Sequence, residues 1–331
     1  MIKNAIAAAV LGVLCCTNGF AQAGGGAPAA LPITPAHAWT EPTHSMMLDA
    51  THAGSRIVAV GEHGIVLLSD DGGRSYRQAK QVPASTTLTS VSFADARHGW
   101  AAGQWGVILA TADGGETWTL QRSDTSIDQP LFSVYFKDAQ HGWAAGLWSL
   151  LLSTDDGGHT WNVAKLPPPP GGGKADRNLF RIFADRSGAL YIAAEKGTVL
   201  RSRDDGGTWE YRNTGNKGSL WTGTAAEDGS IFVGGLLGHL YRSRDGGDTW
   251  TAVDSGANGS ITDLVAVGNR VLGVGLEGFV ISGTTDAGRF TAHERNDRAE
   301  LTTLIVPGAG APVLFSKDGI LNTSDGILNT N

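Results

Sequence analysis

The sequence predicts an all-β fold, a β-propeller of seven four-stranded antiparallel blades. Three observations lead to this prediction. One short motif recurs seven times along the 331 residues. The interval between its copies is the length of one four-stranded blade. No stretch shows a convincing helical period of apolar residues, so we expect very little helix.

The repeated motif is clearest at 103–118, which reads GQWGVILATADGGETW. Each copy carries an aspartate at the same place, and subtraction of their numbers puts successive aspartates 39 to 48 residues apart. The aligned aspartates are Asp71, Asp113, Asp156, Asp204, Asp245, Asp286 and Asp325. Units of this length bury their faces by stacking radially around a central channel.

Residues 1–23 read as an export signal and not as part of the fold. Lys3 precedes an apolar run at 5–14, and small residues before 24 suit cleavage after Ala23. The run is too short to span a bilayer, and no later stretch approaches the ~20 apolar residues that a span needs. We therefore expect a periplasmic or secreted protein that does not itself cross a membrane.

Composition narrows the class of protein further. Both cysteines, Cys15 and Cys16, lie in the predicted signal, so the mature chain must be stable without disulfides. The formal net charge of −7 argues against nucleic-acid binding. We expect a monomer, with a flexible Gly- and Pro-rich lead-in at 24–37 and one propeller domain at 38–331.

The second repeat shows how each blade is built. Its first stretch, LTSVSF, alternates in polarity and is rich in β-branched residues, as strands are. In chain order the expected strands are 88–93, 100–103, 107–112 and 117–121, joined after the second strand by a tight turn at 104–106 and after the third by a turn at 113–116.

The ring of blades must also be closed. One period before Tyr76 stands Trp39, so we predict that 38–41 supplies the outer strand of the last blade and covers its open edge. The alternative is that 327–330 serves instead, because 325–330 repeats the DGILNT of 318–323.

The turn between the third and fourth strands has the pattern Ser/Thr-x-Asp-x-Gly-x-Thr-Trp, as at 111–118. Its aspartate can accept backbone N–H groups of its own turn, and its glycine supplies a positive φ. Its tryptophan can fill the space between adjacent sheets. This is the Asp-box of the BNR-repeat proteins. Because the acid recurs in every blade, we interpret it as scaffold and not as a catalytic carboxylate.

A longer pattern surrounds the Asp-box. Residues 91–103 (VSFADARHGWAAG) and 134–146 (VYFKDAQHGWAAG) match each other closely, and each leads into a G-x-I-L or similar strand before the box. This resembles the photosystem II stability/assembly factor family. The resemblance implies an exported seven-bladed propeller that binds protein partners, as an assembly or accessory factor for a membrane or envelope complex. The photosynthetic role of that family transfers poorly to this chain, because its net charge is acidic and it has no concentrated run of arginines.

An enzyme reading is weaker. Sialidases also carry Asp-boxes, but they need an arginine triad, a tyrosine nucleophile with a glutamate, and an acid. Arg181 faintly matches their arginine motif, yet it lies in the fourth blade with no proline after it, so we interpret it as an inner-strand residue. His98 and His141 occupy equivalent loops of successive blades and should not converge on a metal. We predict no catalytic, cofactor or metal site.

A partner-binding face is predicted where the blades differ from one another. The turns between second and third strands vary in sequence, and they share a face with the starts of the inner strands. An aromatic patch with a polar border is typical of protein-binding surfaces. The predicted face comprises His63, Trp105, Trp148, Lys196, Phe132, Phe180, Arg181 and Trp221.

Three alternatives concern this face. The rings of Trp105 and Trp148 could serve stability alone by covering the neighbouring blade. The aromatic mouth could stack on sugars in a carbohydrate-binding or glycoside-hydrolase propeller, which would need two convergent carboxylates. The long loop at 165–178 opens on the same face, and we interpret it as a surface insertion in preference to a contact arm.

Overall fold

The computed structural model describes residues 32–308 and 310–321, and the structural statements below concern these residues. They form seven antiparallel sheets with short 3-10 turns and without an α-helix. The all-β, seven-bladed prediction is therefore confirmed. Among the described residues no helix could cross a bilayer.

The blades follow one another in chain order. The first three contain β1 (Met47–Ala53), β2 (Arg56–Gly61), β3 (Val66–Ser69) and β4 (Arg77–Gln78); β5 (Leu88–Phe93), β6 (Gly99–Gly103), β7 (Ile108–Thr111) and β8 (Thr119–Arg122); β9 (Leu131–Phe136), β10 (Gly142–Gly146), β11 (Leu151–Thr154) and β12 (Asn162–Val163). The others contain β13 (Leu179–Ala184), β14 (Leu190–Ala194), β15 (Thr198–Ser202) and β16 (Glu210–Asn213); β17 (Leu220–Ala225), β18 (Ile231–Gly235), β19 (Leu240–Ser243) and β20 (Thr251–Val253); β21 (Ile261–Val267), β22 (Arg270–Gly275), β23 (Phe279–Thr284) and β24 (Thr291–Glu294); β25 (Leu301–Ile305), β26 (Val313–Ser316) and β27 (Gly319–Leu321).

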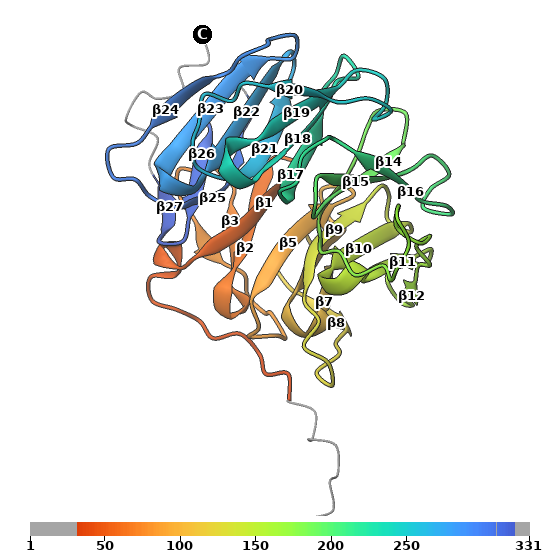
Figure 1. The fold of residues 1–331 in the computed structure, drawn as a ribbon. Helices are drawn as coiled ribbons and strands as arrows, with labels where there is room; N and C mark the ends of the chain where they lie inside the picture. The colour runs from red at the N-terminus through yellow and green to blue at the C-terminus, as the bar shows by residue number, and fades with distance from the viewer. Residues whose placement is uncertain (1–31, 309, 322–331) are drawn as a thin grey trace, which may run out of the picture.

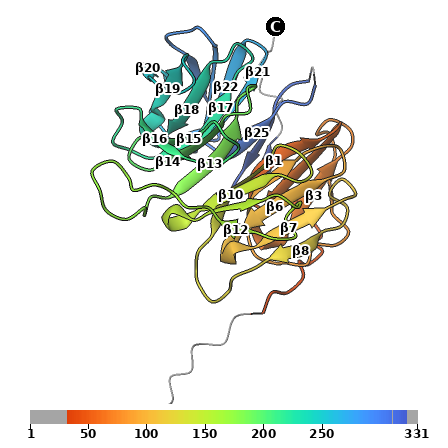
Figure 2. The same ribbon diagram turned by 90° about the vertical axis from the view of Figure 1, so that its right-hand side faces the viewer.

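The inner strands form the ring. Each first strand packs against the first strand of the next blade, and β25 packs against β1, so the circle closes. Figure 1 shows the chain running around this ring from the orange first blade to the blue last one, and Figure 2 shows β25 beside β1. Buried hydrophobic clusters fill the seams between neighbouring blades, as in the cluster that joins Val58 and Leu68 to Val91 and Leu109.

The closing strand differs from the prediction. The last sheet has three strands in the described residues, and 38–41 forms no strand. The backbone N–H of Trp39 donates to the side chain of Gln78 (3.0 Å), which itself donates to the carbonyl of His37 (2.7 Å). The backbone of His37 and Trp39 is therefore hydrogen-bonded to the outer strand of the first blade, and not to the last blade. The alternative closure by 327–330 lies outside the described residues.

The chain still meets the last blade just after this segment. The 3-10 turn η1 (Pro42–His44) contacts β27. A Cβ placed on Gly319 would lie 2.0 Å from the carbonyl oxygen of Thr43, and one on Gly64 would lie 1.9 Å from that of Ala84 in the link between the first two blades. Thr43 thus occupies the place of an ordinary link between blades.

Candidate binding face and central channel

The turns between second and third strands each display one side chain. Five are the 3-10 turns η2 (Glu62–Gly64), η3 (Gln104–Gly106), η4 (Leu147–Ser149), η5 (Leu236–Gly238) and η6 (Leu276–Gly278). Their central residues have a positive φ, which non-glycine residues rarely adopt, and the fourth blade repeats this at its own turn. The central residues are His63, Trp105, Trp148, Lys196, Leu237 and Glu277. One backbone shape thus presents varied chemistry from blade to blade.

The displayed side chains are not equally available to a partner. Trp148 is 58% exposed and Leu237 is 70% exposed. Trp105 instead packs on the hydrophobic cluster between the first two blades. Of the two tryptophans on these turns, Trp148 is therefore the more available to a partner and Trp105 is partly buried, while Leu237 was absent from the predicted face. Leu237 occupies the same left-handed turn position as Trp105, and the G-x-x-G at 235–238 matches that at 103–106, so the repeat could have identified it.

The long loop at 165–178 ends beneath the Trp148 turn. The backbone N–H of Trp148 donates to the side-chain oxygen of Asn178 (3.1 Å), and that of Ser149 donates to the carbonyl of Arg177 (2.7 Å). The Arg177 guanidinium lies 5.3 Å from the centre of the Tyr211 ring. The C-terminal end of the loop is thus fixed to the fourth blade and supports the exposed tryptophan.

The N-terminal segment packs beside the displayed residue of the first blade, His63, whose side chain stays 61% exposed. The rings of Trp39 and His63 have centres 5.5 Å apart, and Trp39 remains 44% exposed. His37 packs edge-on against the same tryptophan at 5.7 Å. His63 therefore contributes to this face together with Trp39, which the sequence analysis had assigned to a strand.

The inner strands begin with a β-bulge on this face. In the second blade Leu88 pairs with Gly103 and Ser90 pairs with Ala102, so Thr89 is skipped. The skipped residues of the seven blades are Leu48, Thr89, Phe132, Phe180, Trp221, Thr262 and Thr302. The three threonine hydroxyls donate to the carbonyl of the next inner strand, as Thr89 does to Leu131 (2.7 Å).

Aromatic residues fill this bulge position in three consecutive blades. Phe132 and Phe180 stack with ring centres 5.5 Å apart, and Trp221 takes the same position in the next blade. All three are partly exposed. The structure thus brings the predicted aromatic residues together as one wall of the channel mouth, facing a hydroxyl-bearing wall. Such a mixed mouth can hold apolar side chains while it binds a backbone through hydrogen bonds.

One residue further along each inner strand, a ring of polar side chains lines the channel. Its members are Asp49, Ser90, Ser133, Arg181, Thr222, Asp263 and Thr303. These residues connect neighbouring blades, as when the N–H of Val134 donates to the Ser90 hydroxyl (3.1 Å). The ring is thus a hydrogen-bonded layer beneath the mouth.

Arg181 crosses the channel within this layer. It belongs to the fourth blade, yet its Nη1 lies 3.0 Å from Oδ2 of Asp49 in the first blade, and the two blades are not neighbours. Burial opposes its charge, but the carboxylates of Asp49 and Asp263 together raise the pKa of Arg181 above its usual value. Its side chain is 30% exposed, so it forms the floor of the mouth. Arg181 is an inner-strand residue, as interpreted from the sequence.

The two acids of the channel, Asp49 and Asp263, were not predicted from the sequence. Asp49 accepts the Ser90 hydroxyl (2.9 Å), and Asp263 accepts the Thr303 hydroxyl (2.7 Å). Both are buried, and burial raises the pKa of Asp263 although Arg181 acts against it. Alignment of the inner strands could have found them, because a polar residue recurs at one position of each strand.

The Asp-box carboxylates are used inside their own turns. In the third blade Asp156 accepts the backbone N–H (2.9 Å) and the hydroxyl (2.7 Å) of Thr160 and the hydroxyl of Thr154 (2.8 Å). The bonds from Thr160 lower the pKa of Asp156 to about 2. The same bonds recur around Asp71, Asp113, Asp204 and Asp245. Asp286 retains the bond from Thr284, and Asp325 lies outside the described residues.

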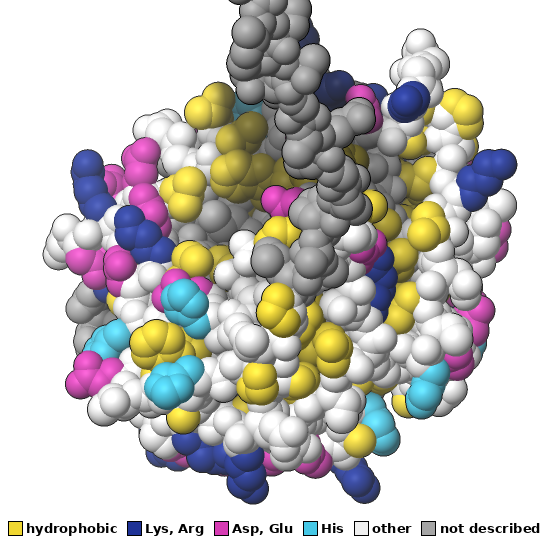
Figure 3. All heavy atoms as spheres, turned by 90° about the horizontal axis from the view of Figure 1, so that it is seen from below, with side chains coloured by type: hydrophobic (Ala, Val, Ile, Leu, Met, Phe, Trp, Pro, Cys, Tyr) yellow, Lys and Arg dark blue, Asp and Glu magenta, His cyan; other side chains and the backbone are white. Residues whose placement is uncertain are grey.

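The acids of the variable turns do not form a pair. Glu62 accepts the backbone N–H of Met46 (2.9 Å), and Glu195 accepts the side chain of Asn178 (2.9 Å). Glu277 is exposed on the sixth blade. Within 32–308 and 310–321 no group of three or more metal-ligating side chains is placed to hold an ion. On the face shown in Figure 3, hydrophobic, acidic, basic and histidine side chains are interspersed.

Comparisons with known proteins agree with this geometry. A sequence model of the family described as photosynthesis system II assembly factor YCF48 matches the chain at 78–230 and 121–297. A solved structure described as YCF48 bound to D1 peptide is 18% identical, with a TM-score of 0.67, over 87% of this chain and 98% of that one. YCF48 from Cyanidioschyzon merolae is 17% identical, with a TM-score of 0.65, over 84% and 95%. No curated protein matches the chain.

Proposed function

The chain belongs to the family of the photosynthesis system II assembly factor YCF48, and on that premise we propose that it is a non-catalytic protein-binding propeller. Its ligand is an extended segment of a partner protein, and its role is that of an assembly or accessory factor for a membrane or envelope complex. A similar structure solved with a D1 peptide supports a peptide segment as the ligand.

The observation that carries the proposal is the composition of the variable face. Trp148 and Leu237 stand exposed on rigid turns, close in the ring to the aromatic wall of Phe132 and Phe180. Exposed aromatic anchors held by a stiff backbone lose little conformational entropy on binding, and such anchors dominate the energetics of protein interfaces. The hydroxyl-bearing wall opposite can accept hydrogen bonds from a peptide backbone, because its threonine hydrogens already donate to carbonyls within the ring.

The hydrogen bonds of the two channel carboxylates support a non-catalytic role. Asp49 and Asp263 each hold backbone N–H and hydroxyl groups of a neighbouring blade. A glycoside hydrolase needs one acid free to give a proton and a second free to act as base or nucleophile. We also propose that the protein works as a monomer in the periplasm or outside the cell, as its predicted signal implies.

Affinity capture with a matched pair of double variants tests the proposal. Trp148→Ala with Leu237→Ala removes the exposed anchors, and we expect the proteins captured from an envelope fraction to fall at least tenfold. Leu120→Ala with Val163→Ala removes exposed hydrophobic side chains from outer strands and should leave capture unchanged. Equal capture by both folded variants, or loss in the outer-strand variant alone, would refute the proposed face.

A further inference from the structure

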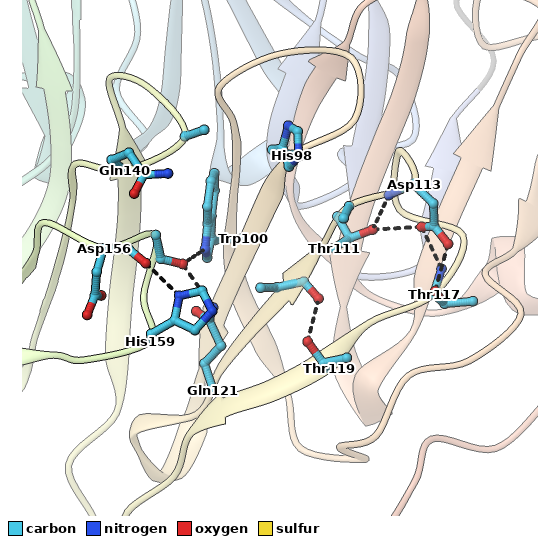
Figure 4. Close-up of a pocket in the computed structure, with 14 residues that line it drawn as sticks. His98, Trp100, Thr111, Asp113, Thr117, Thr119, Gln121, Gln140, Asp156 and His159 are labelled. Carbon is cyan, nitrogen blue, oxygen red and sulfur yellow. Dashed lines mark hydrogen bonds between the residues drawn. The ribbon is translucent and has the colours of Figure 1, made fainter.

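A hollow of about 460 Å³ opens at the rim between the second and third blades. It lies on the Asp-box side of the ring, at the strand ends opposite the variable face. Its lining residues include Ala110. Figure 4 shows His98, Trp100, Thr119, Gln140 and His159, which also line it, around the opening. The proposed partner-binding face has no part in it.

The same seam elsewhere in the ring is filled by an arginine. The carbonyl that follows the Asp-box aspartate accepts a guanidinium from the preceding blade at three seams. Arg56 donates to Gly114 (3.0 Å), Arg201 donates to Gly246, and Arg242 donates to Ala287 (2.9 Å). In the second seam the equivalent carbonyl, that of Gly157, instead accepts the indole of Trp100 (3.0 Å) and the amide of Gln121 (2.9 Å).

Sequence position explains why this seam is hollow. Arg201 and Arg242 each precede the first serine of an Asp-box, and the residue at that position in the second blade is Ala110. In the fourth blade Arg201 pairs across the strands with Glu210, whereas Ala110 pairs with the short Thr119. The volume that a seam arginine fills between the fourth and fifth blades is therefore left open between the second and third.

The electrostatics of the hollow favour a cation. Asp113 and Asp156 line it, and no described lysine or arginine does. The bonds from Thr160 keep Asp156 ionised by lowering its pKa to about 2. A planar guanidinium, which carries five N–H donors in a fork, matches the carboxylates of Asp113 and Asp156 better than an ammonium group does.

We propose that this hollow binds the guanidinium of an arginine side chain presented by another protein. The incoming arginine occupies the volume that Arg201 fills in its own seam, while the Gly157 carbonyl keeps its hydrogen bonds to Trp100 and Gln121. The ring thus has a second recognition site, specific for a basic residue, on the face opposite the aromatic mouth. The acidic net charge of −7 favours the approach of a basic partner.

Titration with a minimal probe tests this proposal. N-acetyl-L-arginine amide is added to the full chain, and the indole N–H resonance of Trp100 is followed by NMR. We expect a saturable shift of that resonance. N-acetyl-L-citrulline amide has nearly the same shape without the charge, and we expect it to bind at least tenfold more weakly. Equal shifts with both probes, or no shift with arginine, would overturn the proposal.

Filling the hollow provides the matched variant. Ala110→Arg supplies a seam arginine from within the chain, and we expect it to weaken probe binding at least tenfold without lowering the melting temperature. Thr119→Arg places an arginine in the hollow from an exposed strand position, and we expect it to weaken probe binding in the same way. This second variant keeps the test decisive if Ala110→Arg does not fold. Trp148→Ala, on the other face, should bind the probe like the unaltered chain. Unaltered binding by the folded filling variants would contradict the assignment.

Discussion

At the scale of single residues, the channel of the propeller is lined by a layer of buried polar side chains where apolar side chains could have packed. Arg181 and Asp49 meet across the channel at 3.0 Å, and Asp263 adds a second negative charge to the same layer. A buried charge is costly unless it is paired and hydrogen-bonded. The ring of hydroxyl and carboxylate groups supplies those bonds, so each of these residues depends on the others.

This dependence predicts the result of a double-mutant cycle. Arg181→Met leaves Asp49 buried without its partner, and we expect the free energy of unfolding to fall by about 3–5 kcal/mol. Adding Asp49→Asn removes the unpaired charge and should restore a large part of that loss. Urea denaturation of the single and double variants measures both effects.

A surface pair provides the control for this cycle. Arg186 and Glu227 lie 2.8 Å apart with side chains 68% and 62% exposed. Arg186→Met should therefore cost at most about 1 kcal/mol. If Arg181→Met cost no more than this, the channel pair would not have the structural role assigned to it.

The sequence placed Arg181 on an inner strand but could not reveal its partner. Asp49 lies three blades away, and their contact exists only because the ring closes. The displayed residue Leu237 has the same left-handed turn position as Trp105, yet Leu237 is exposed and Trp105 packs on the core. Tertiary geometry therefore decides which of the variable residues contact solvent, and Trp105 and Trp148 differ for the same reason.

At the scale of the element, the Asp-box joins one blade to the next through its tryptophan. Trp118 is 1% exposed, and its indole donates to the carbonyl of Gly115 (2.9 Å). Trp161 has the same position in the third blade, but it is only partly buried and its indole N–H has no described hydrogen-bond partner. Equivalent positions of the repeat should therefore contribute unequally to stability.

The inequality can be measured directly. Trp118→Ala should lower the free energy of unfolding by about 3–5 kcal/mol, because it empties a packed seam. Trp161→Ala, at the edge of the hollow seam, should cost clearly less. Urea denaturation of the two variants gives the comparison, and an equal or larger loss for Trp161→Ala would contradict this view of the seams.

Strands inside a blade were predictable from the repeat, whereas the closing element was not. The strand expected at 107–112 is β7 (Ile108–Thr111), and the other three of that blade agree within two residues. The period also placed Trp39 one blade before Tyr76, but a period gives sequence position and not a pairing partner. The side chain of Gln78 hydrogen-bonds the backbone of His37 and Trp39, so this segment lies against the first blade.

At the scale of the whole molecule, the two ends of the strands differ in kind. One end repeats the Asp-box in blade after blade, and its carboxylates satisfy their own turns. The other end keeps one turn geometry and varies the residue that it displays. Repetition predicts the scaffold from sequence alone, while the sites that we propose lie where the repeat is broken, at Trp148 and Leu237 on one face and at Ala110 on the other.

Site-specific photocross-linking tests the central claim, that partner proteins bind at the variable face and channel mouth. A photoreactive phenylalanine analogue replaces Trp148, Phe180 or the outer-strand residue Val163 in three separate chains, each exposed to an envelope fraction and irradiated. We predict partner adducts from positions 148 and 180 and none from 163. Adducts from position 163 alone, with none from the two face positions, would contradict the account.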